Sequence, residues 1–231
     1  AQARIDYWTK LGKPPVKGIA ITHRHAPHWQ NAPALQQACG HPPIIASFAE
    51  KPEIEARMAK AKVDKPVRDG DTLSLGNLTV EFLDAPGHTY GSLAIFIREK
   101  RALFTGDNVM GTGSSVVNPG EGEIVLYLQT MEKFLRYDPA VIYPGQGPVV
   151  ADPRGKIQSL IEHRRSRERQ IVAQAAIDEL VARRATAREI LTAARATGFK
   201  TLAEDGIRLV RAGATSLDEL MRVADLTDRM A

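Results

Sequence analysis

The chain lacks the features that define several common classes of protein. It has one cysteine, Cys39, among 231 residues, which excludes an internal disulfide and a cysteine-rich zinc site. No apolar run approaches the roughly 18 residues that a membrane-spanning helix needs. The first twenty residues carry five charged side chains and no apolar signal-peptide core. We therefore expect a cytoplasmic protein without a membrane partner, in which histidine and carboxylate side chains bind any metal.

The chain also lacks a large excess of charge. Its formal net charge is +4, and basic and acidic residues alternate except in "EHRRSRERQ", residues 162–170. Such a cluster is typical of a solvated helix face, and a nucleic-acid surface is the alternative. The sequence has no G-x-x-x-x-G-K-[ST] loop, which excludes ATP hydrolysis of the P-loop type.

Short apolar runs rich in Val, Ile and Leu alternate with helical patterns between residues 15 and 150, separated by Gly, Pro and Asp. This alternation predicts a mixed α/β fold in layers. We expect strands at 16–22, 43–47, 78–85, 92–99, 102–106 and 140–144. We expect helices at 31–39, 51–62 and 122–138.

From about Asp152 the pattern becomes helical throughout. One long helix is predicted from there to about Leu180, and shorter ones at 186–196, 201–212 and 216–226. The last opens with Ser216 three positions before Glu219, which is typical of a capping box.

Three of the six histidines lie within six positions, in "THRHAPHW", residues 22–29. The spacing lets His23 and His25 point the same way from an extended segment, with His28 on the first turn of a following helix. Neutral imidazole is a common zinc ligand, and three such groups plus a water make an open catalytic site. The pattern predicts a metal site, and structural or surface histidines are the alternative.

Three further polar loops follow predicted strands. "LDAPGHTYGS" contains His88, "LFTGDNVMG" contains Asp107, and "VIYPGQGPVV" contains Gln146 in a Gly-Gln-Gly turn. Each segment alone is typical of a simple turn. Together with the histidine loop they place four polar loops at strand ends, which indicates a shared site.

These segments resemble, in order and local context over about residues 16–172, the metallo-β-lactamase superfamily. Within it they are similar to hydrolases of the β-lactamase-like protein 2 and glyoxalase II type. The family pattern is His-x-His-x-Asp-His, then a distant His, a bridging Asp and a final His. The resemblance implies an αββα sandwich with two zinc ions at the sheet edge, one held by three histidines and one by Asp, His and His.

The resemblance assigns the first metal's ligands to His23, His25 and His88, with Asp107 as the bridging carboxylate. All four residues are present. It also implies catalytic roles for Asp107, which would help to position the attacking water, and for His28.

The second metal site departs from the family at two positions. Pro27 stands where the family has Asp, and Gln146 stands where it has His. Proline offers no carboxylate, and an amide is a poorer zinc ligand than imidazole. We therefore expect one tightly held zinc, with Asp107 or water in the fourth position. Tyr90, Ser114, Ser115 and Gln146 lie in loops that would line a substrate pocket.

The two ends of the chain also depart from the family. Only 22 residues precede His23, so we expect a sandwich without its N-terminal strands and with a hydrophobic sheet face or edge exposed. Residues 198–223 resemble the C-terminal end of type II secretion and type IV pilus assembly ATPases. A helical cap or oligomer contact is the simplest interpretation of that segment. A fragment, or a fusion of two gene segments, would account for these departures.

The predicted organisation is a metallo-β-lactamase-like domain at residues 1–150 and an all-helical segment at 151–231. The first functional hypothesis is a zinc-dependent hydrolase of an ester, thioester or phosphodiester. The second is an inactive pseudoenzyme or scaffold of the same fold, and the third is an RNA-binding or ribonuclease role. Expected partners are a small-molecule or phosphodiester substrate and a second copy of the chain.

Overall fold

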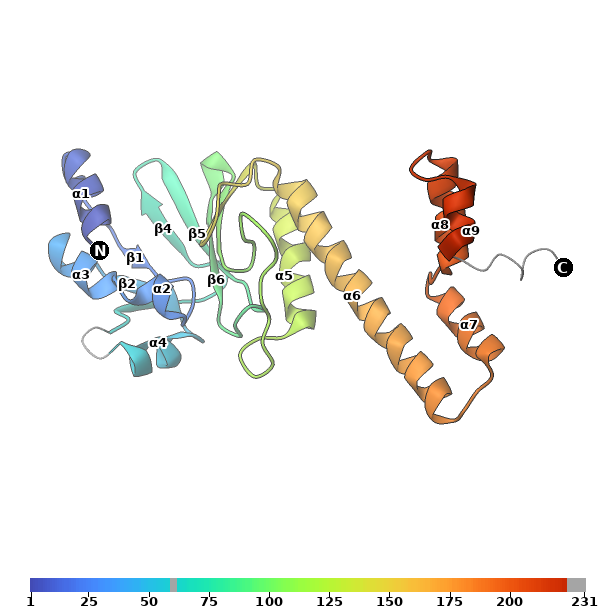
Figure 1. The fold of residues 1–231 in the computed structure, drawn as a ribbon. Coiled ribbons are helices and arrows are strands. Elements are labelled where there is room, and N and C mark those ends of the chain that lie inside the picture. The colour runs from blue at the N-terminus through green and yellow to red at the C-terminus, as the bar shows by residue number, and fades with distance from the viewer. Residues whose placement is uncertain (59–61, 224–231) are drawn as a thin grey trace. The chain divides into compact units, whose positions relative to one another are not determined.

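The computed structural model describes residues 1–58 and 62–223, and its strands form two sheets (Figure 1). The smaller sheet is parallel, in the order β1 (Ile19–Ala20), β2 (Ile44–Ser47) and β3 (Lys65–Val67). The larger sheet follows chain order: β4 (Thr72–Leu75), β5 (Leu78–Asp84), β6 (Leu93–Ile97), β7 (Ala102–Gly106) and β8 (Val141–Pro144). Its pairs are antiparallel except β7 with β8, which are parallel.

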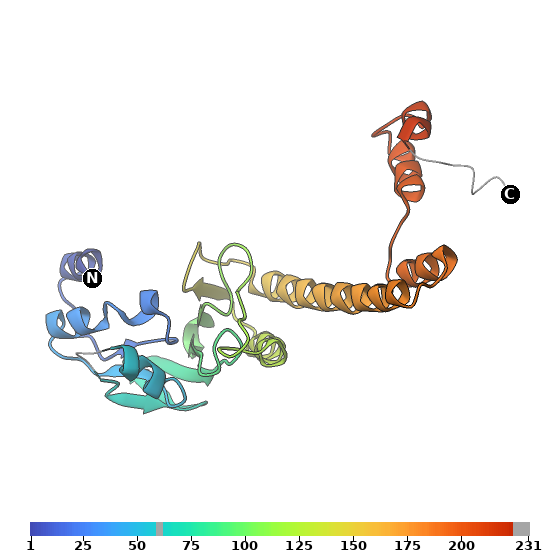
Figure 2. The same cartoon turned by 60° about the horizontal axis from the view of Figure 1, so that its bottom comes forward.

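Helices cover the outer face of each sheet, which gives the expected αββα sandwich (Figures 1 and 2). Helices α3 (Ala32–Ala38) and α4 (Lys51–Arg57) pack on the smaller sheet through Ala32 and Ile54. Helix α5 (Ile124–Tyr137) and the first turns of α6 (Pro153–Ala182) pack on the larger sheet through Met131 and Ile157. The fold class predicted from the sequence is therefore confirmed.

Alternate side chains of β5 and β6 pack into two separate hydrophobic cores. Val80, Phe82 and Leu93 face the smaller sheet, whereas Leu83 and Phe96 face α5. Successive side chains of a strand point to opposite faces. A strand buried on both faces is therefore apolar at nearly every position, which is why these strands appear as short apolar runs in the sequence.

The predicted strand at 16–22 is the one that differs most from the structure, where β1 has only two residues. The chain leaves the smaller sheet after Ile21, whose N–H still donates to Ile45. The carbonyl of Thr22 then accepts a hydrogen bond of 2.8 Å from Leu93 N, at the start of β6 in the other sheet. This crossing between sheets ends β1 and directs the histidine loop to the sheet edge.

Other elements differ in length or are absent from the prediction. Helix α4 ends at Arg57, short of the predicted residue 62, and residues 59–61 lie outside the described part of the chain. The sequence analysis missed α1 (Gln2–Lys10), which buries no residue, the four-residue α2 (Ala26–Trp29) and the 3-10 turn Arg98–Lys100. It also missed two strands, β4 and β3. β3 contains Pro66, a residue that disfavours strand assignment and is tolerated at sheet edges.

One face of the larger sheet is only partly covered by the smaller sheet. Phe104 on β7 and Tyr143 on β8 stack with ring centroids 4.9 Å apart and are 38% and 39% exposed. An apolar groove next to Phe104 is lined from both sheets, by Gly18, Ala20, Ile45, Ile95 and Ile97 among others. Among the described strands β1 lies at the edge of its sheet. The larger sheet thus exposes stacked aromatic rings beside an apolar groove, and the expected absence of N-terminal strands stays a prediction.

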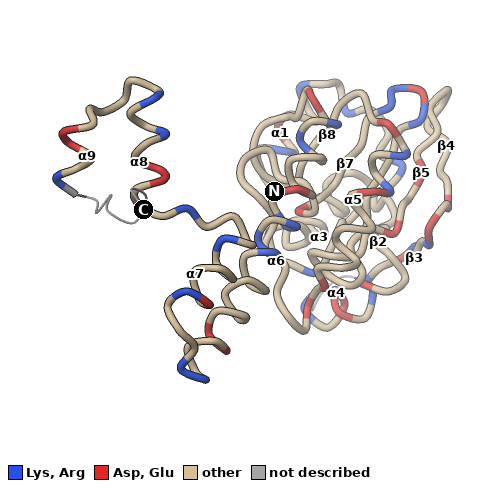
Figure 3. The backbone as a smooth tube through the Cα atoms, turned by 90° about the vertical axis from the view of Figure 1, so that its right-hand side faces the viewer, with Lys and Arg blue, Asp and Glu red and all other residues tan. Residues whose placement is uncertain are grey.

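The contacts divide the chain into two compact units, Ala1–Ile161 and Glu162–Ala231. The described part of the second unit is helical and contains the rest of α6, α7 (Ala187–Ala196), α8 (Leu202–Arg211) and α9 (Leu217–Val223). Residues of both charge signs occur along α7, α8 and α9 (Figure 3). The predicted boundary at residue 150 and the resemblance of the tail to secretion ATPases stay predictions.

Capping residues start the short helices of the second unit. Thr186 and Thr201 form full capping boxes with Glu189 and Glu204, neither of which the sequence analysis identified. The Ser216 half of the capping box predicted for the last helix is present, because Ser216 Oγ accepts from Glu219 N at 3.2 Å. Residues 224–226, the predicted end of that helix, lie outside the described residues. None of the described helices is long and apolar enough to cross a membrane.

Candidate metal centre

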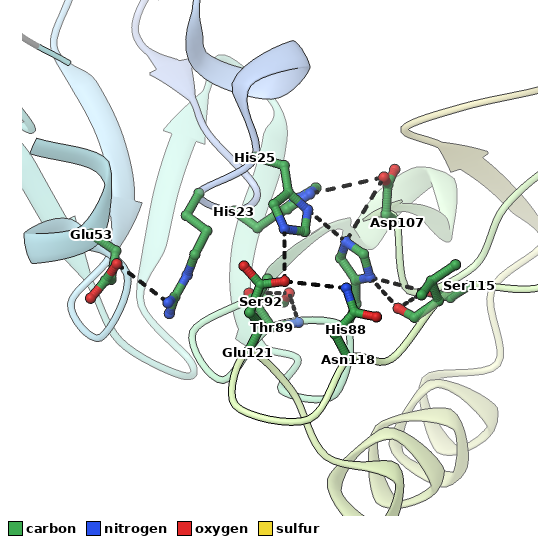
Figure 4. Close-up of polar contacts among 12 residues, drawn as sticks. His23, His25, Glu53, His88, Thr89, Ser92, Asp107, Ser115, Asn118 and Glu121 are labelled. Carbon is green, nitrogen blue, oxygen red and sulfur yellow. Dashed lines mark hydrogen bonds and ion pairs between the residues drawn. The ribbon is translucent and has the colours of Figure 1, made fainter. Parts of the chain in front are cut away.

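The predicted polar loops meet at one edge of the sandwich because of the strand directions. β5 and β7 are each antiparallel to β6, so they run parallel to one another, and β8 is parallel to β7. Their carboxyl ends therefore lie at the same edge, where α/β folds present ligand-binding residues. The loops after them carry His88, Asp107 and Gln146. The histidine loop after β1 reaches the same edge, where Figure 4 shows His23 and His25 beside His88 and Asp107.

Close packing of two loops fixes the position of His23. A side chain at Gly106, which has φ +53°, would place its Cβ 2.8 Å from Thr22 Cβ, so glycine permits both the turn and the approach. Thr22 Oγ1 lies 3.1 Å from His23 Nδ1. That contact engages Nδ1 and leaves Nε2 of the buried His23 ring as its ligand atom.

The proline inside the histidine loop has a structural role. His25 is the N-cap of α2, and Pro27 lies in the first turn of that helix. Proline suits this position because the first N–H groups of a helix have no intrahelical acceptor and its fixed φ is helical. The turn brings His28 back towards His23, with ring centroids 4.1 Å apart.

The tautomer of His88 follows from its contact with Val116. His88 Nδ1 lies 2.6 Å from the carbonyl oxygen of Val116, which can only accept, so Nδ1 carries the proton. His88 Nε2 is then unprotonated and lies 3.0 Å from His25 Nδ1. A backbone carbonyl that binds the other ring nitrogen is the usual support of a metal-binding histidine.

The ligand atoms form two overlapping groups of three. His23, His25 and His88 form one group, and His23, His28 and Asp107 form the other, with all ligand atoms of a group within 4.8 Å of one another. Asp107 Oδ2 lies 3.3 Å from His28 Nε2, 3.9 Å from His23 Nε2 and 4.0 Å from His88 Nε2. Ligand atoms of a tetrahedral zinc site are ~3.3 Å apart, so small movements of these side chains would complete either group.

Three buried atoms in this cluster have no hydrogen-bond partner among the described residues. They are His23 Nε2, His28 Nε2 and Asp107 Oδ1. Leaving a buried polar atom unsatisfied costs about 1–3 kcal/mol. Three such atoms close together, with imidazole and carboxylate chemistry, fit a divalent metal ion such as zinc.

Burial keeps His23 and His88 in the neutral form that binds metal. Desolvation and the neighbouring rings of His28 and His88 lower the pKa of His23 to about 2. Desolvation also lowers the pKa of His88, although the Val116 carbonyl opposes the shift. Burial would raise the pKa of Asp107, but His28, His23 and the hydrogen bond from Gln146 outweigh it and hold that pKa below its usual value. The carboxylate is thus ionised, and the lowered pKa values of His23 and His88 favour their neutral imidazole form.

Gln146 and Gly145 complete the wall beside Asp107. Gln146 Nε2 donates a hydrogen bond of 2.7 Å to Asp107 Oδ2. A Cβ at Gly145 would lie 2.6 Å from Asp107 Oδ1 and 2.7 Å from His28 Cε1, so glycine leaves room for those two side chains.

The other predicted pocket residues surround this cluster at different depths. Tyr90 is 47% exposed and Ser114 is half-buried. Gln146 is exposed, although its side-chain amide binds Asp107. Ser115 is buried, and its Oγ lies 3.1 Å from His88 Nδ1, on the nitrogen that faces Val116. Ser115 therefore contacts the candidate ligand His88 on the side away from the cluster. Substrate contact by any of the four residues stays a prediction.

Three residues around the cluster were not found from the sequence. Asn108 is buried and joins two loops, because its Oδ1 accepts from His88 N and its Nδ2 donates to Ala85 O. Its place directly after Asp107 was the only available indication. Glu121 Oε2 lies 3.7 Å from His25 Nε2. Glu50 is fully buried and bonds Arg24 and Thr89, and nothing in the sequence around it indicates this.

An αββα sandwich with histidines and an aspartate at one sheet edge is typical of the metallohydrolase class of proteins. The family model described as the metallo-beta-lactamase superfamily matches residues 1–146, and the chain belongs to that superfamily. The match covers all the predicted site residues.

The relatives that match this chain in sequence are about twice as long as the matched stretch. The atrochrysone carboxyl ACP thioesterase AgnL7 of Paecilomyces divaricatus is 29% identical over 154 residues, 67% of this chain and 46% of the relative. The beta-lactamase-like protein 2 homolog of Caenorhabditis elegans is 29% identical over 163 residues, 68% of this chain and 51% of the relative. The chain thus spans about half the length of these relatives.

Solved structures show the same fold. A metallo-beta-lactamase family protein of Thermus thermophilus aligns with a TM-score of 0.61 and 20% identity, covering 77% of this chain and 70% of that one. A metallo-beta-lactamase from Pontibacter korlensis aligns with a TM-score of 0.58 and 21% identity, covering 70% and 73%. At this identity the likeness supports the fold alone.

Proposed function

We propose that the protein is a zinc-dependent hydrolase of an ester, thioester or phosphodiester, and that a thioester is its substrate class. The observation that carries this proposal is the convergence of His23, His25 and His88 beside Asp107, with buried ligand atoms that lack partners among the described residues. Zinc supplies a Lewis acid that polarises a carbonyl oxygen and makes water acidic enough to attack near neutral pH. We expect one ion, because both groups of ligands need the same nitrogen of His23.

The chain's own residues would orient the reaction. The hydrogen bond from Gln146 holds Asp107 Oδ2, so Asp107 Oδ1 is the atom that can accept a proton from the attacking water. His28 Nε2 lies 3.3 Å from the same carboxylate and can share that proton. Positioning a water between such groups is the usual form of general base catalysis.

The names of the relatives support a thioester. AgnL7 and a protein of Emericella nidulans are named atrochrysone carboxyl ACP thioesterases, and they match this chain at 29% and 26% identity. Water attacks the acyl carbon of a thioester, and a thiolate leaves. Because a thiolate is a good leaving group, the reaction depends less on acid catalysis than ester or amide hydrolysis does, which suits a site with few proton donors.

The alternative is a pseudoenzyme of the same fold. Pro27 and Gln146 favour it, because they replace two ligands that the family resemblance places at the second metal. A protein that holds one zinc without turnover would satisfy the same geometry.

The test compares hydrolysis of a short acyl thioester, a p-nitrophenyl ester and bis(p-nitrophenyl) phosphate by the chain supplied with one equivalent of zinc. We expect zinc-dependent turnover of the thioester, lost on chelation and in His88→Ala. His163→Ala, which removes an exposed histidine of α6, is the matched control and should keep full activity. One bound zinc without turnover of any of the three substrates would favour the pseudoenzyme.

A further inference from the structure

A buried carboxylate outside the ligand group connects the two loops that carry the three histidines. Glu50 lies directly before α4 and is 0% exposed. Its Oε1 accepts from Arg24 N at 2.9 Å, Arg24 Nε at 3.0 Å and Thr89 Oγ1 at 2.8 Å. Its Oε2 accepts from Arg24 Nη2 at 2.8 Å. Four donors from two distant segments thus converge on one side chain.

The partners of Glu50 are the immediate neighbours of the ligands. Arg24 lies between His23 and His25, and Thr89 follows His88. The bond to Arg24 N holds the main chain itself between two ligands, which a surface ion pair would not do. Figure 4 shows Thr89 and Ser92 beneath the histidine cluster, on the side away from Asp107.

The hydrogen-bond directions around Thr89 require an acceptor at Glu50. Thr89 N donates to Ser92 Oγ at 3.1 Å, so the Ser92 hydroxyl can donate to Thr89 Oγ1, 2.8 Å away. The Thr89 hydroxyl then donates to Glu50. A carboxylate accepts at all its positions, whereas an amide would point an N–H group at one of these donors.

The charge of Arg24 alone does not explain Glu50. Arg24 Nη1 also lies 3.4 Å from Glu53 Oε2, and the Glu53 side chain is 42% exposed. An exposed partner balances a charge at lower desolvation cost than a buried one. Unlike the contact of Glu53 with Arg24, the bonds of Glu50 connect the loop of His23 and His25 to the loop of His88.

We propose that Glu50 is a positioning residue for the metal centre. It holds the two ligand loops together and so sets the 3.0 Å separation of His25 Nδ1 and His88 Nε2 before metal binds. This inference rests on the proposed zinc site. Residues that orient metal ligands in this way typically change metal affinity by about 10–100-fold when they are replaced.

The first test is the zinc affinity of Glu50→Gln, measured by competition with a chelator of known affinity. We expect an affinity about 10–100-fold weaker than that of the parent chain, and an altered visible absorption spectrum of the Co²⁺-loaded protein. The matched control is Glu81→Gln. Glu81 is 8% exposed and accepts from Arg98 Nε at 2.7 Å and Tyr137 Oη at 2.8 Å, and it is not among the metal-site residues. It should lower the thermal midpoint and leave zinc affinity unchanged.

A second test uses a pair of variants at Thr89, which leave the charge of Glu50 unchanged. Thr89→Val removes the hydroxyl that donates to Glu50 and should weaken zinc binding, whereas Thr89→Ser keeps the hydroxyl and should restore it. This pair decides the question if Glu50→Gln does not fold. In the metal-free protein, amide hydrogen exchange at residues 23–25 and 88–90 should rise together in Thr89→Val and stay at the parent level in Thr89→Ser.

The outcomes separate this inference from the proposed function. Parental zinc affinity in both Glu50→Gln and Thr89→Val would overturn the positioning role and leave the zinc site intact. Weakened affinity in both, in a protein that turns over no substrate, would support the positioning role and count against the hydrolase. A parent chain that binds no zinc would overturn both.

Discussion

Gln146 Nε2 donates to Asp107 Oδ2 at 2.7 Å, the same oxygen that faces His23, His28 and His88. The amide therefore presents an N–H group at the position where the family resemblance implies a histidine lone pair. The positive end of an N–H dipole repels a cation. We therefore expect this contact to weaken a second metal position and to orient the carboxylate towards a first one.

Replacing the two divergent residues should restore a second metal position. We expect about one zinc per chain in the parent and a value that rises towards two in Pro27→Asp/Gln146→His. Imidazole and carboxylate are better zinc ligands than an amide or a proline ring. Pro27 lies at the start of α2, where aspartate is compatible with the helix dipole. Zinc content after dialysis, measured by atomic emission, checks the prediction.

The chain offers a matched control for this experiment. Gln36 Nε2 donates to Asp64 Oδ2 at 2.9 Å, a pair of the same chemistry outside the candidate metal centre, where His41 contacts Gln36 only through a main-chain hydrogen bond. Gln36→His should leave zinc content at the parent value. A double variant that stays at one zinc would contradict the role assigned to Pro27 and Gln146.

The metal-free protein should lose stability as the pH falls below about 6.5. The pKa of His23 is depressed to about 2 by burial and that of His88 is also lowered, so the unfolded chain binds more protons than the folded chain in this range. The free energy of unfolding then decreases with falling pH, by up to about 1.4 kcal/mol per pH unit for each such histidine. Urea unfolding in the presence of chelator from pH 7.5 to 4.5 measures the slope.

His23→Gln isolates the main contributor to that slope. Glutamine binds no proton in this range. The free energy of unfolding of the variant should therefore change less steeply with pH, by the contribution of one histidine, whatever the variant's absolute stability. His163→Ala removes an exposed histidine and should leave the slope unchanged. Equal slopes in the parent and in His23→Gln would mean that His23 titrates normally in the folded protein.

Much of the site could be predicted because its residues occur at strand ends with a specific order. The apolar runs of β5, β7 and β8 are each followed by a polar loop, and the chain direction of these strands brings His88 and Asp107 to one edge. The mixed α/β layers and the clustering of the candidate ligands follow from that pattern, whereas the αββα sandwich was expected from the family resemblance.

The supporting residues could not be predicted because their roles depend on packing between distant segments. Glu50 bonds residues 26 and 39 positions away, and it has no local pattern that marks a buried carboxylate. The short β1 has a similar origin, since the bond from Leu93 to Thr22 that ends it joins two sheets. Sequence periodicity reports on one element at a time, so contacts of this kind are not visible in it.

Gly87 should be intolerant of any side chain. It has φ +146°, and a Cβ there would lie 2.5 Å from Tyr127 Cα in α5. We expect Gly87→Ala to lower the free energy of unfolding by about 3 kcal/mol through overpacking against a helix backbone and strain at positive φ. The neighbouring His88 should bind zinc more weakly in this variant. Urea unfolding and chelator competition measure the two effects.

Gly70→Ala separates strain from overpacking. Gly70 has φ +82°, and a Cβ at this position would meet no described atom within 4 Å, so only the backbone contribution should remain. That contribution is about 1 kcal/mol. Similar losses in both variants would show that the loop of Gly87 moves away from α5 at little cost.

The partly covered sheet face should make the chain associate with a second copy. Phe104 and Tyr143 expose stacked rings beside the apolar groove, and β1 has an edge that can pair with another strand. Exposed apolar surface next to an unpaired strand edge favours such contacts.

We expect sedimentation velocity to show a concentration-dependent dimer in the parent and a shift towards monomer in Phe104→Ser. Tyr7→Ser, which removes a 65% exposed aromatic of α1 outside the groove, should leave the dimer unchanged. A parent chain that stays monomeric at all concentrations, or equal association of both variants, would show that this face does not bind a second copy.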